Sequence, residues 1–594
     1  MHTLPSRLSP RHRRSKLAPV ALLGLLSGIA CGGSAPPSVP PSLVLPVPPG
    51  PRALSVETPA HGHARAASAF GPVRDRVLDE ILAANPSTAR SLGLHAYDGK
   101  VAPVSKAAIA ARVARLGEAS AELAKVERDG LSDDESLDLA ELESWVAEDL
   151  FALVDEDLPR KLPQFYDDLF DVSVYVDRAY EPIEERAKRL TEQEEAALDE
   201  VGHIRENLTP PLSRPATEVA AHNVAGFVTY LRGDVAKVMG QVGDEAQRKR
   251  FAKANEALAR AAVELAAWLK KEAARGDQSH VLGLERYTKL LRVQEGWTRP
   301  LAEFDRLNEE DLAANKKAYE ELAAHVKGPF VREADLFATA TRMMTDAREF
   351  VASRHIVTLP TADAPVVRET PSYERWNAAS IEMSGPFETT RSAFYQLTFP
   401  DRTWPAKERQ AYLGTLGVLL GTTIHEVYPG HFVQGRWAER APTRVQKAFG
   451  NYAFTEGWAH YTEQMMIEEG FGKDDPSNRL DMLNGALLRN CRFAASVGIH
   501  TRGMTLEQVE KRFVDDCHQP ASEAHEQALR GTFDPGYFAY TLGKLQILAL
   551  REEAKKALGP RFSLQRFHDA LLAHGAPPVA LIHDRVLRDL ATAP

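Results

Sequence analysis

The sequence predicts an all-α fold, mainly helical, with one small β-hairpin. Long stretches repeat apolar residues at intervals of three or four, the spacing of a helix with one buried face. The clearest stretch runs from residue 251 to 269, and charged residues occupy its other face. The same pattern recurs over residues 133–158, 191–207, 333–354 and 545–557. Strand signals are sparse: residues 356–359 and 366–367 predict the hairpin, which we expect beside the functional site.

The first 64 residues are expected to lie outside the folded body. Five basic residues between Arg7 and Lys16 precede an apolar run, as in a signal peptide, here over residues 1–30. Cys31 follows this run in a sequence that resembles a bacterial lipobox, where cleavage before a cysteine lets that cysteine carry lipid. The alternative is an ordinary secretory peptide cut at a small residue. Eight prolines between residues 35 and 51 predict a stiff, extended tether over residues 31–64.

Charge restricts the partners that the mature chain can bind. Loss of the five basic residues of the signal peptide changes the net charge from −10 to about −15. This acidity argues against a nucleic-acid partner and against adhesion to anionic lipid by charge. The expected membrane link is therefore a lipid on Cys31, which places the protein in the cell envelope. Glycine instead of aspartate after Cys31 favours the outer membrane. The sequence does not indicate an oligomeric state.

Two parts follow the tether. Residues 65–355 are predicted to be a helical N-terminal part, and residues 356–594 the part that carries the chemistry. Whether they are two domains or one continuous helical body stays open. Cys491 and Cys517 are the only cysteines after Cys31. They either form a disulfide in an oxidising compartment or remain as buried thiols.

The segments HEVYPGH at 425–431 and EGWAH at 456–460 carry the chemistry. Two imidazoles and one carboxylate form the ligand set of catalytic zinc, which leaves a fourth position for water. We therefore predict one zinc ion on His425, His431 and Glu456. Glu426 follows the first histidine and is the predicted general base for the attacking water.

The interval between the two histidines requires a break in the helix. In the usual zinc-peptidase motif the second histidine comes four residues after the first and lies on the same helix face. Here the interval is six residues, so an undistorted helix would point His425 and His431 about 120° apart. Proline and glycine break or redirect helices. We therefore expect a break at residues 428–430 that returns His431 to the metal.

Five segments between about residues 355 and 590 resemble a bacterial family known as domain of unknown function 885. They are HEVYPGHFVQ, FTEGWAHYTEQMMIEEGF, CRFAASVGIHTRGMTLEQV, DPGYFAYTLGKLQI and RFSLQRFHDALLAHGAPP. The resemblance implies a gluzincin-like helical peptidase with a deep cleft and with zinc on His425, His431 and Glu456. It also implies a likeness to thermostable carboxypeptidases and to oligopeptidases of the angiotensin-converting-enzyme type. This chain departs from the family pattern at Ser496, where an aspartate is expected. The departure affects the residues that surround the metal ligands, not the ligands themselves.

Further residues are predicted to serve catalysis. Tyr540, and after it Tyr537, are candidate donors to the oxyanion, because GYFAYTLGK resembles a tyrosine-bearing segment of those carboxypeptidases. Alternatively, both tyrosines pack at the start of an aromatic helix. His500 is another candidate donor. Three cations are candidates for holding a substrate carboxylate, or else are surface and ion-pair residues: Arg492, Arg530 and Lys544.

His460 has three possible roles: a fourth ligand, a donor to a ligand, or a packed polar residue. Four protein ligands suit structural rather than catalytic zinc, so we predict that His460 supports the ligands from outside. Glu463 and Asn451 are other candidates for this role.

The leading hypothesis is a zinc metallopeptidase that cleaves short peptides with Glu426 as base. One alternative is a zinc amidase or esterase with a non-peptide substrate. The other is a non-catalytic lipoprotein scaffold with a structural metal. Glu426 discriminates between enzyme and scaffold, because a structural metal needs no base beside its ligand.

Overall fold

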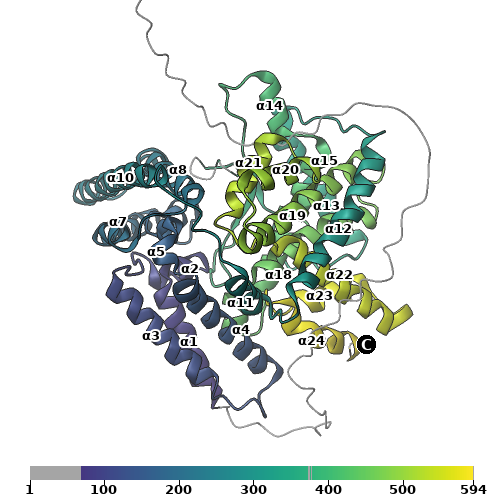
Figure 1. Cartoon of the computed structure of the whole chain (residues 1–594), viewed down its shortest axis with the longest axis horizontal. Coiled ribbons are helices and arrows are strands. Elements are labelled where there is room, and N and C mark those ends of the chain that lie inside the picture. The colour runs from purple at the N-terminus through teal and green to yellow at the C-terminus, as the bar shows by residue number, and fades with distance from the viewer. Residues whose placement is uncertain (1–68, 372–374, 376, 593–594) are drawn as a thin grey trace, which may run out of the picture.

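The computed structural model describes residues 69–371, 375 and 377–592, and this part of the chain is mainly helical with one small sheet (Figure 1). The predicted fold class is confirmed. The predicted signal peptide, the tether and Cys31 lie outside the described residues. Among the described helices, none is both long enough and apolar enough to cross a membrane.

Two groups of helices at the left of Figure 1 make up most of the N-terminal part, and each has its own apolar core. The first group is α1 (Phe70–Ala84), α2 (Pro86–Ser91), α3 (Lys106–Leu123) and α4 (Asp133–Leu150). The second is α5 (Leu158–Lys161), α6 (Ser173–Asp177), α7 (Ile183–Asn207), α8 (Arg214–Tyr230), α9 (Ala236–Met239) and α10 (Glu245–Ala273). In α10 the predicted apolar face is buried, because Phe251, Leu258 and Leu265 are each at most 3% exposed.

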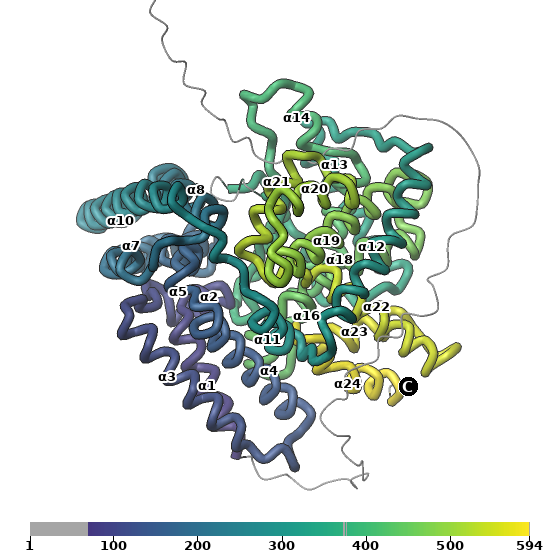
Figure 2. The backbone as a smooth tube through the Cα atoms, viewed as in Figure 1, coloured from purple at the N-terminus to yellow at the C-terminus, as the bar shows by residue number. Residues whose placement is uncertain are grey.

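The helices α11 (Leu284–Glu295) and α12 (Leu301–Ala323) precede residue 356 but pack on the C-terminal part. Phe304 of α12 lies 4.6 Å, between ring centroids, from Phe493. A shared apolar core therefore joins the two parts of the chain. Figure 2 shows α11 and α12 running along the C-terminal part.

The C-terminal part, together with α13, which precedes residue 356 and packs on α15, is a compact set of helices. They are α13 (Leu336–Ser353), α14 (Ala406–Leu413), α15 (Leu416–Glu426), α16 (His431–Ala438), α17 (Arg444–Ala448), α18 (Tyr452–Glu468), α19 (Pro476–Arg502), α20 (Leu506–Asp515), α21 (Ala521–Gly531), α22 (Ala539–Leu558), α23 (Leu564–Leu572) and α24 (Val579–Thr592). Helices α18 and α22 approach closely where Gly457 meets Gly543. A methyl group on Gly457 would lie 2.4 Å from the Gly543 Cα, so this contact needs glycine.

The sheet has three strands in the order β1-β3-β2, with β1 (Val366–Glu369) parallel and β2 (Ala379–Met383) antiparallel to β3 (Ala393–Leu397). It packs beside α15, where the Tyr395 hydroxyl lies 3.2 Å from the Thr423 hydroxyl. The predicted hairpin between residues 356–359 and 366–367 is therefore wrong. Residues 366–367 belong to β1, but residues 356–359 form no strand.

Side chains, rather than a neighbouring strand, bind the backbone of residues 356–359. The Ile356 carbonyl accepts a hydrogen bond from His568 Nδ1 at 2.7 Å. The Thr358 N–H donates to Asp569 Oδ1 at 2.8 Å, and its carbonyl accepts from Trp437 Nε1 at 3.0 Å. These bonds satisfy the buried backbone groups without a sheet ladder.

A disulfide joins Cys491 of α19 to Cys517, which follows α20, across a sequence separation of 26 residues. The sequence left open whether these cysteines form a disulfide or remain buried thiols, and the structure has the disulfide. The bond fastens α20 and the start of the following loop to the helix that also carries Arg489 and Arg492.

Candidate metal centre

The chain between His425 and His431 forms the break that the sequence predicts. Helix α15 ends at Glu426, and His431 is the first residue of α16. The Gly430 N–H donates to the Ile424 carbonyl at 3.0 Å, which folds the chain back on the end of α15. A Cβ on Gly430 would lie 1.8 Å from the His425 carbonyl oxygen. Only glycine fits this turn, which explains the residue before the second histidine.

Helix α18 holds the break in place and supplies the third side chain. Trp458 Nε1 donates to the Pro429 carbonyl at 3.0 Å, and the Trp458 side chain is fully buried. Glu456 lies two residues earlier on the same helix. The close contact of Gly457 with α22 fixes α18 from its other side. The EGW motif therefore combines a candidate ligand, a helix contact and a hydrogen bond to the break.

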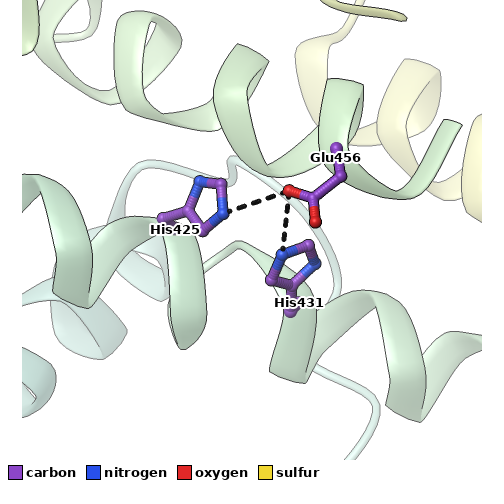
Figure 3. Close-up of side chains that lie close together, drawn as sticks. All are labelled: His425, His431 and Glu456. Carbon is purple, nitrogen blue, oxygen red and sulfur yellow. Dashed lines mark ion pairs between the residues drawn. The ribbon is translucent and has the colours of Figure 1, made fainter. Parts of the chain in front are cut away.

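Figure 3 shows His425, His431 and Glu456 pointing toward one another. Glu456 Oε2 lies 3.4 Å from His425 Nε2 and 3.6 Å from His431 Nε2. One ligand atom of each residue lies within 4.8 Å of the others, so the group could hold a metal ion. Tetrahedral zinc with bonds of about 2.0–2.2 Å holds neighbouring ligand atoms roughly 3.3–3.5 Å apart. Glu456 Oε2 is buried and accepts no hydrogen bond from any described residue, as expected of a metal ligand.

Glu463 orients the first histidine from outside the group. His425 Nδ1 donates to Glu463 Oε1 at 2.7 Å, so the other ring nitrogen presents its lone pair to the metal position. Arg489 Nη2 donates to the same oxygen at 2.8 Å. Burial alone would raise the pKa of Glu463, but Arg489 and His425 outweigh it and hold this pKa below its usual value. Glu463 is therefore an ionised acceptor.

His460 lies near Glu463 and does not belong to the group formed by His425, His431 and Glu456. Its Nδ1 is 3.9 Å from Glu463 Oε1, and neither ring nitrogen makes a hydrogen bond within the described residues. Burial lowers the pKa of His460 to about 3, so the ring is neutral. Asn451 has a different role from the predicted one, because it caps α18 by accepting from the Phe454 N–H at 2.7 Å.

Glu426 lies within the electrostatic field of all three candidate ligands. It is half-buried, and burial raises the pKa of its carboxyl while His425 and His431 oppose the increase. A raised pKa brings a carboxylate closer to the pH at which a general base works well.

A cluster of tyrosines and arginines adjoins the group. The Tyr540 hydroxyl accepts from Arg530 Nη2 at 3.4 Å, and Arg489 lies over the Tyr540 ring at 5.8 Å. Sequence reasoning missed Tyr452, whose ring centroid lies 5.8 Å from that of Tyr540. Tyr452 comes four residues before Glu456, so helical spacing places both on one face of α18. This four-residue spacing could have identified Tyr452 as a candidate site residue from the sequence.

The structure contradicts the predicted role of His500. This residue is 11 positions after Arg489 in α19, which corresponds to about 16 Å along the helix. His500 Nε2 donates to the Gly531 carbonyl at 2.9 Å, and the ring stacks near Tyr287. His500 therefore lies away from the metal group. Ser496 also lies in this region, where its hydroxyl donates to the Pro535 carbonyl at 2.6 Å.

Two other predicted residues already have buried partners. Lys544 is fully buried, and its Nζ lies 2.8 Å from Asp311 Oδ2. It neutralises a buried carboxylate and cannot hold a substrate carboxylate, so this prediction is wrong. Tyr537 is also fully buried, and its hydroxyl donates to Gln527. Of the two tyrosines, Tyr540 is the more exposed, at 6% against 0% for Tyr537.

Comparison with known proteins gives a family and a fold. The family model described as "Bacterial protein of unknown function (DUF885)" matches residues 86–586. Among curated proteins, none matches the chain.

Solved structures with the same fold include two candidate lipoproteins. The one from Shewanella oneidensis, of unknown function, is 25% identical with a TM-score of 0.70, and the match covers 88% of this chain and 100% of that chain. The one from Colwellia psychrerythraea is 17% identical with a TM-score of 0.71 and the same coverage. Trypanosoma cruzi metallocarboxypeptidase 1 is distant: it is 12% identical with a TM-score of 0.38, over 87% of this chain and 96% of that chain.

Proposed function

The chain belongs to the bacterial family DUF885, and we propose that it is a zinc-dependent metallopeptidase that cleaves short peptides. The observation that carries this proposal is the convergence of His425, His431 and Glu456, together with Glu426, which follows His425 in the chain and interacts electrostatically with all three. A structural metal needs no such base, and three protein ligands leave a position free. The partial exposure of the three side chains, between 10% and 20%, supports access to this position.

The chain's own residues supply the proton transfers. His425, His431 and Glu456 would hold the zinc ion, which when bound would lower the pKa of its water to about 7 and polarise a carbonyl. Glu426 accepts a proton from the attacking water at its carboxylate and returns it to the leaving amine. Glu463 keeps the His425 ring in the orientation that the ligand set requires.

Tyr540 is the proposed donor to the oxyanion. Its side chain is 6% exposed, and its hydroxyl contacts only Arg530 within the described residues, at 3.4 Å. A phenol that donates to the developing negative charge stabilises the transition state more than the substrate.

We also propose that a lipid on Cys31 holds the protein in the cell envelope, on the outer membrane. Two structural neighbours are candidate lipoproteins, which supports this location. The disulfide between Cys491 and Cys517 is consistent with an oxidising compartment.

Replacement of the base tests the proposed function. Metal analysis of the purified protein should give one zinc per chain, and a chelator should abolish cleavage of a short-peptide library until zinc is restored. Glu426→Gln should lower kcat by about 10²- to 10⁴-fold and leave the zinc content unchanged. The control is Glu408→Gln, at an exposed position of α14, which should match the wild type in both measurements. Wild-type turnover in Glu426→Gln, or activity that survives chelation, contradicts the proposal.

A further inference from the structure

Arg492 of α19 has a cationic group without an ionic partner. Its Nε donates to Gln527 Oε1 at 2.8 Å, and this is its only hydrogen bond within the described residues. No described carboxylate lies within 4.0 Å of it. The side chain is half-buried. Its two terminal nitrogens are therefore available donors.

The neighbouring charges do not supply the missing partner. Arg530 is paired with Asp534 at 3.1 Å, and Arg489 is paired with Glu463 at 2.8 Å. Glu523 forms no ion pair with Arg492 within the described residues. Of these three arginines, Arg492 is therefore the one without an ionic partner in the part of the chain that the structure describes.

Two aromatic rings fix the orientation of this guanidinium. Arg492 Cζ lies 4.8 Å from the Tyr540 centroid and 5.1 Å from the Tyr537 centroid. Such cation–π contacts, together with the bond to Gln527, hold the guanidinium plane before a ligand arrives. An oriented fork with two free N–H groups matches the geometry of a carboxylate.

Arg492 also lies close to the metal group. Arg489 and Arg492 are three residues apart in α19, so their Cβ atoms are about 5–6 Å apart on one helix face. Arg489 Nη2 lies 3.3 Å from His425 Nδ1, and both arginines contact the Tyr540 ring. Arg492 therefore belongs to the cluster of side chains that adjoins the metal group.

We propose that Arg492 is a specificity-determining residue that binds a carboxylate of the substrate close to the cleaved bond. The inference rests on the proposed peptidase function and adds its substrate class. The carboxylate comes from either of two sources, the free C-terminus of a peptide or an aspartate or glutamate side chain. Arg530 and Lys544 do not serve this purpose, because each is already paired with an acid.

Kinetics on three matched peptides distinguishes the two sources. One peptide has neutral side chains and a free C-terminus, the second is its C-terminal amide, and the third is that amide with a glutamate next to the cleaved bond. The wild type should prefer one of the two carboxylate peptides over the neutral amide by about 10- to 100-fold in kcat/KM. Arg492→Met should remove this preference, and Arg492→Lys should restore part of it. Arg342→Met, at an exposed position of α13, should keep the wild-type preference.

Binding of the same peptides to the zinc-loaded Glu426→Gln variant, measured by calorimetry, tests the inference without turnover. Its preference for a carboxylate peptide should disappear in the Glu426→Gln/Arg492→Met double variant, at unchanged zinc content. Equal binding of all three peptides overturns the inference, even if peptides are cleaved. A carboxylate preference in binding without cleavage by the wild type contradicts the proposed function and leaves the binding site in place.

Discussion

The ring of His425 is held at both nitrogens. Nδ1 is hydrogen-bonded to Glu463 and Nε2 faces Glu456, so a carboxylate outside the candidate ligand group decides which nitrogen would face a metal ion. Glu463 follows Glu456 by seven residues in α18, so the same helix supplies one candidate ligand and the residue that orients another.

Removal of the Glu463 charge should weaken metal binding. We expect Glu463→Gln to reduce zinc affinity by about 10- to 100-fold, because the His425 ring loses its ionised acceptor. Competition with a chromophoric chelator measures this affinity. Glu469→Gln, directly after α18, is the matched control and should bind zinc as the wild type does. Equal affinities of both variants would show that Glu463 does not support the metal.

At the level of single residues, sequence reasoning grouped the same candidate ligands as the structure, because His425 and His431 lie within one stretch of seven residues and their type indicates a metal. The role of Glu426 as base stays a prediction. Sequence reasoning failed for Lys544, whose partner Asp311 is 233 residues earlier in the chain. Which cation is paired and which is free depends on packing between distant helices, and no local pattern encodes that.

At the level of elements, the break between α15 and α16 is set by Gly430 and held by Trp458 of α18. The sequence predicted the break because an interval of six residues cannot place two histidines on one helix face. By contrast, the sequence wrongly predicted a strand at residues 356–359. There the backbone binds the side chains of His568, Asp569 and Trp437, which come from distant helices.

Two glycines near the end of α15 should respond oppositely to alanine. Gly430→Ala places a methyl group against the His425 carbonyl, so we expect the unfolding free energy to fall by roughly 1–3 kcal/mol and zinc affinity to fall with it. Gly421→Ala, within α15, meets no atom within 4 Å and should be neutral or stabilising by up to about 1 kcal/mol. Chemical denaturation and zinc titration of both variants measure these changes. A Gly430→Ala protein with wild-type zinc affinity would contradict the role of the turn.

At the level of the whole molecule, the helical pattern predicted the fold class because amphipathic periodicity is a property of each segment. The joining of the two parts was not predictable in this way. Helices α11 and α12 belong to the N-terminal part by sequence and pack on α19 and α22 in space. Their apolar faces show that they are buried, but not which partner buries them.

The disulfide should contribute to the stability of the C-terminal part. Closure of a loop with a sequence separation of 26 residues predicts a contribution of about 3.5 kcal/mol in the chain-entropy model. Thermal unfolding with and without dithiothreitol measures it. The reductant should lower the midpoint of the wild type and have no effect on a Cys491→Ser/Cys517→Ser variant. Equal midpoints of the wild type with and without reductant would contradict this prediction.

Anomalous diffraction at the zinc edge tests the central claim most directly. A crystal of the zinc-loaded protein should give one strong peak about 2.0–2.2 Å from His425 Nε2, His431 Nε2 and a Glu456 oxygen. A peak at other residues, or none at these three, would contradict the assignment of this group as the metal centre.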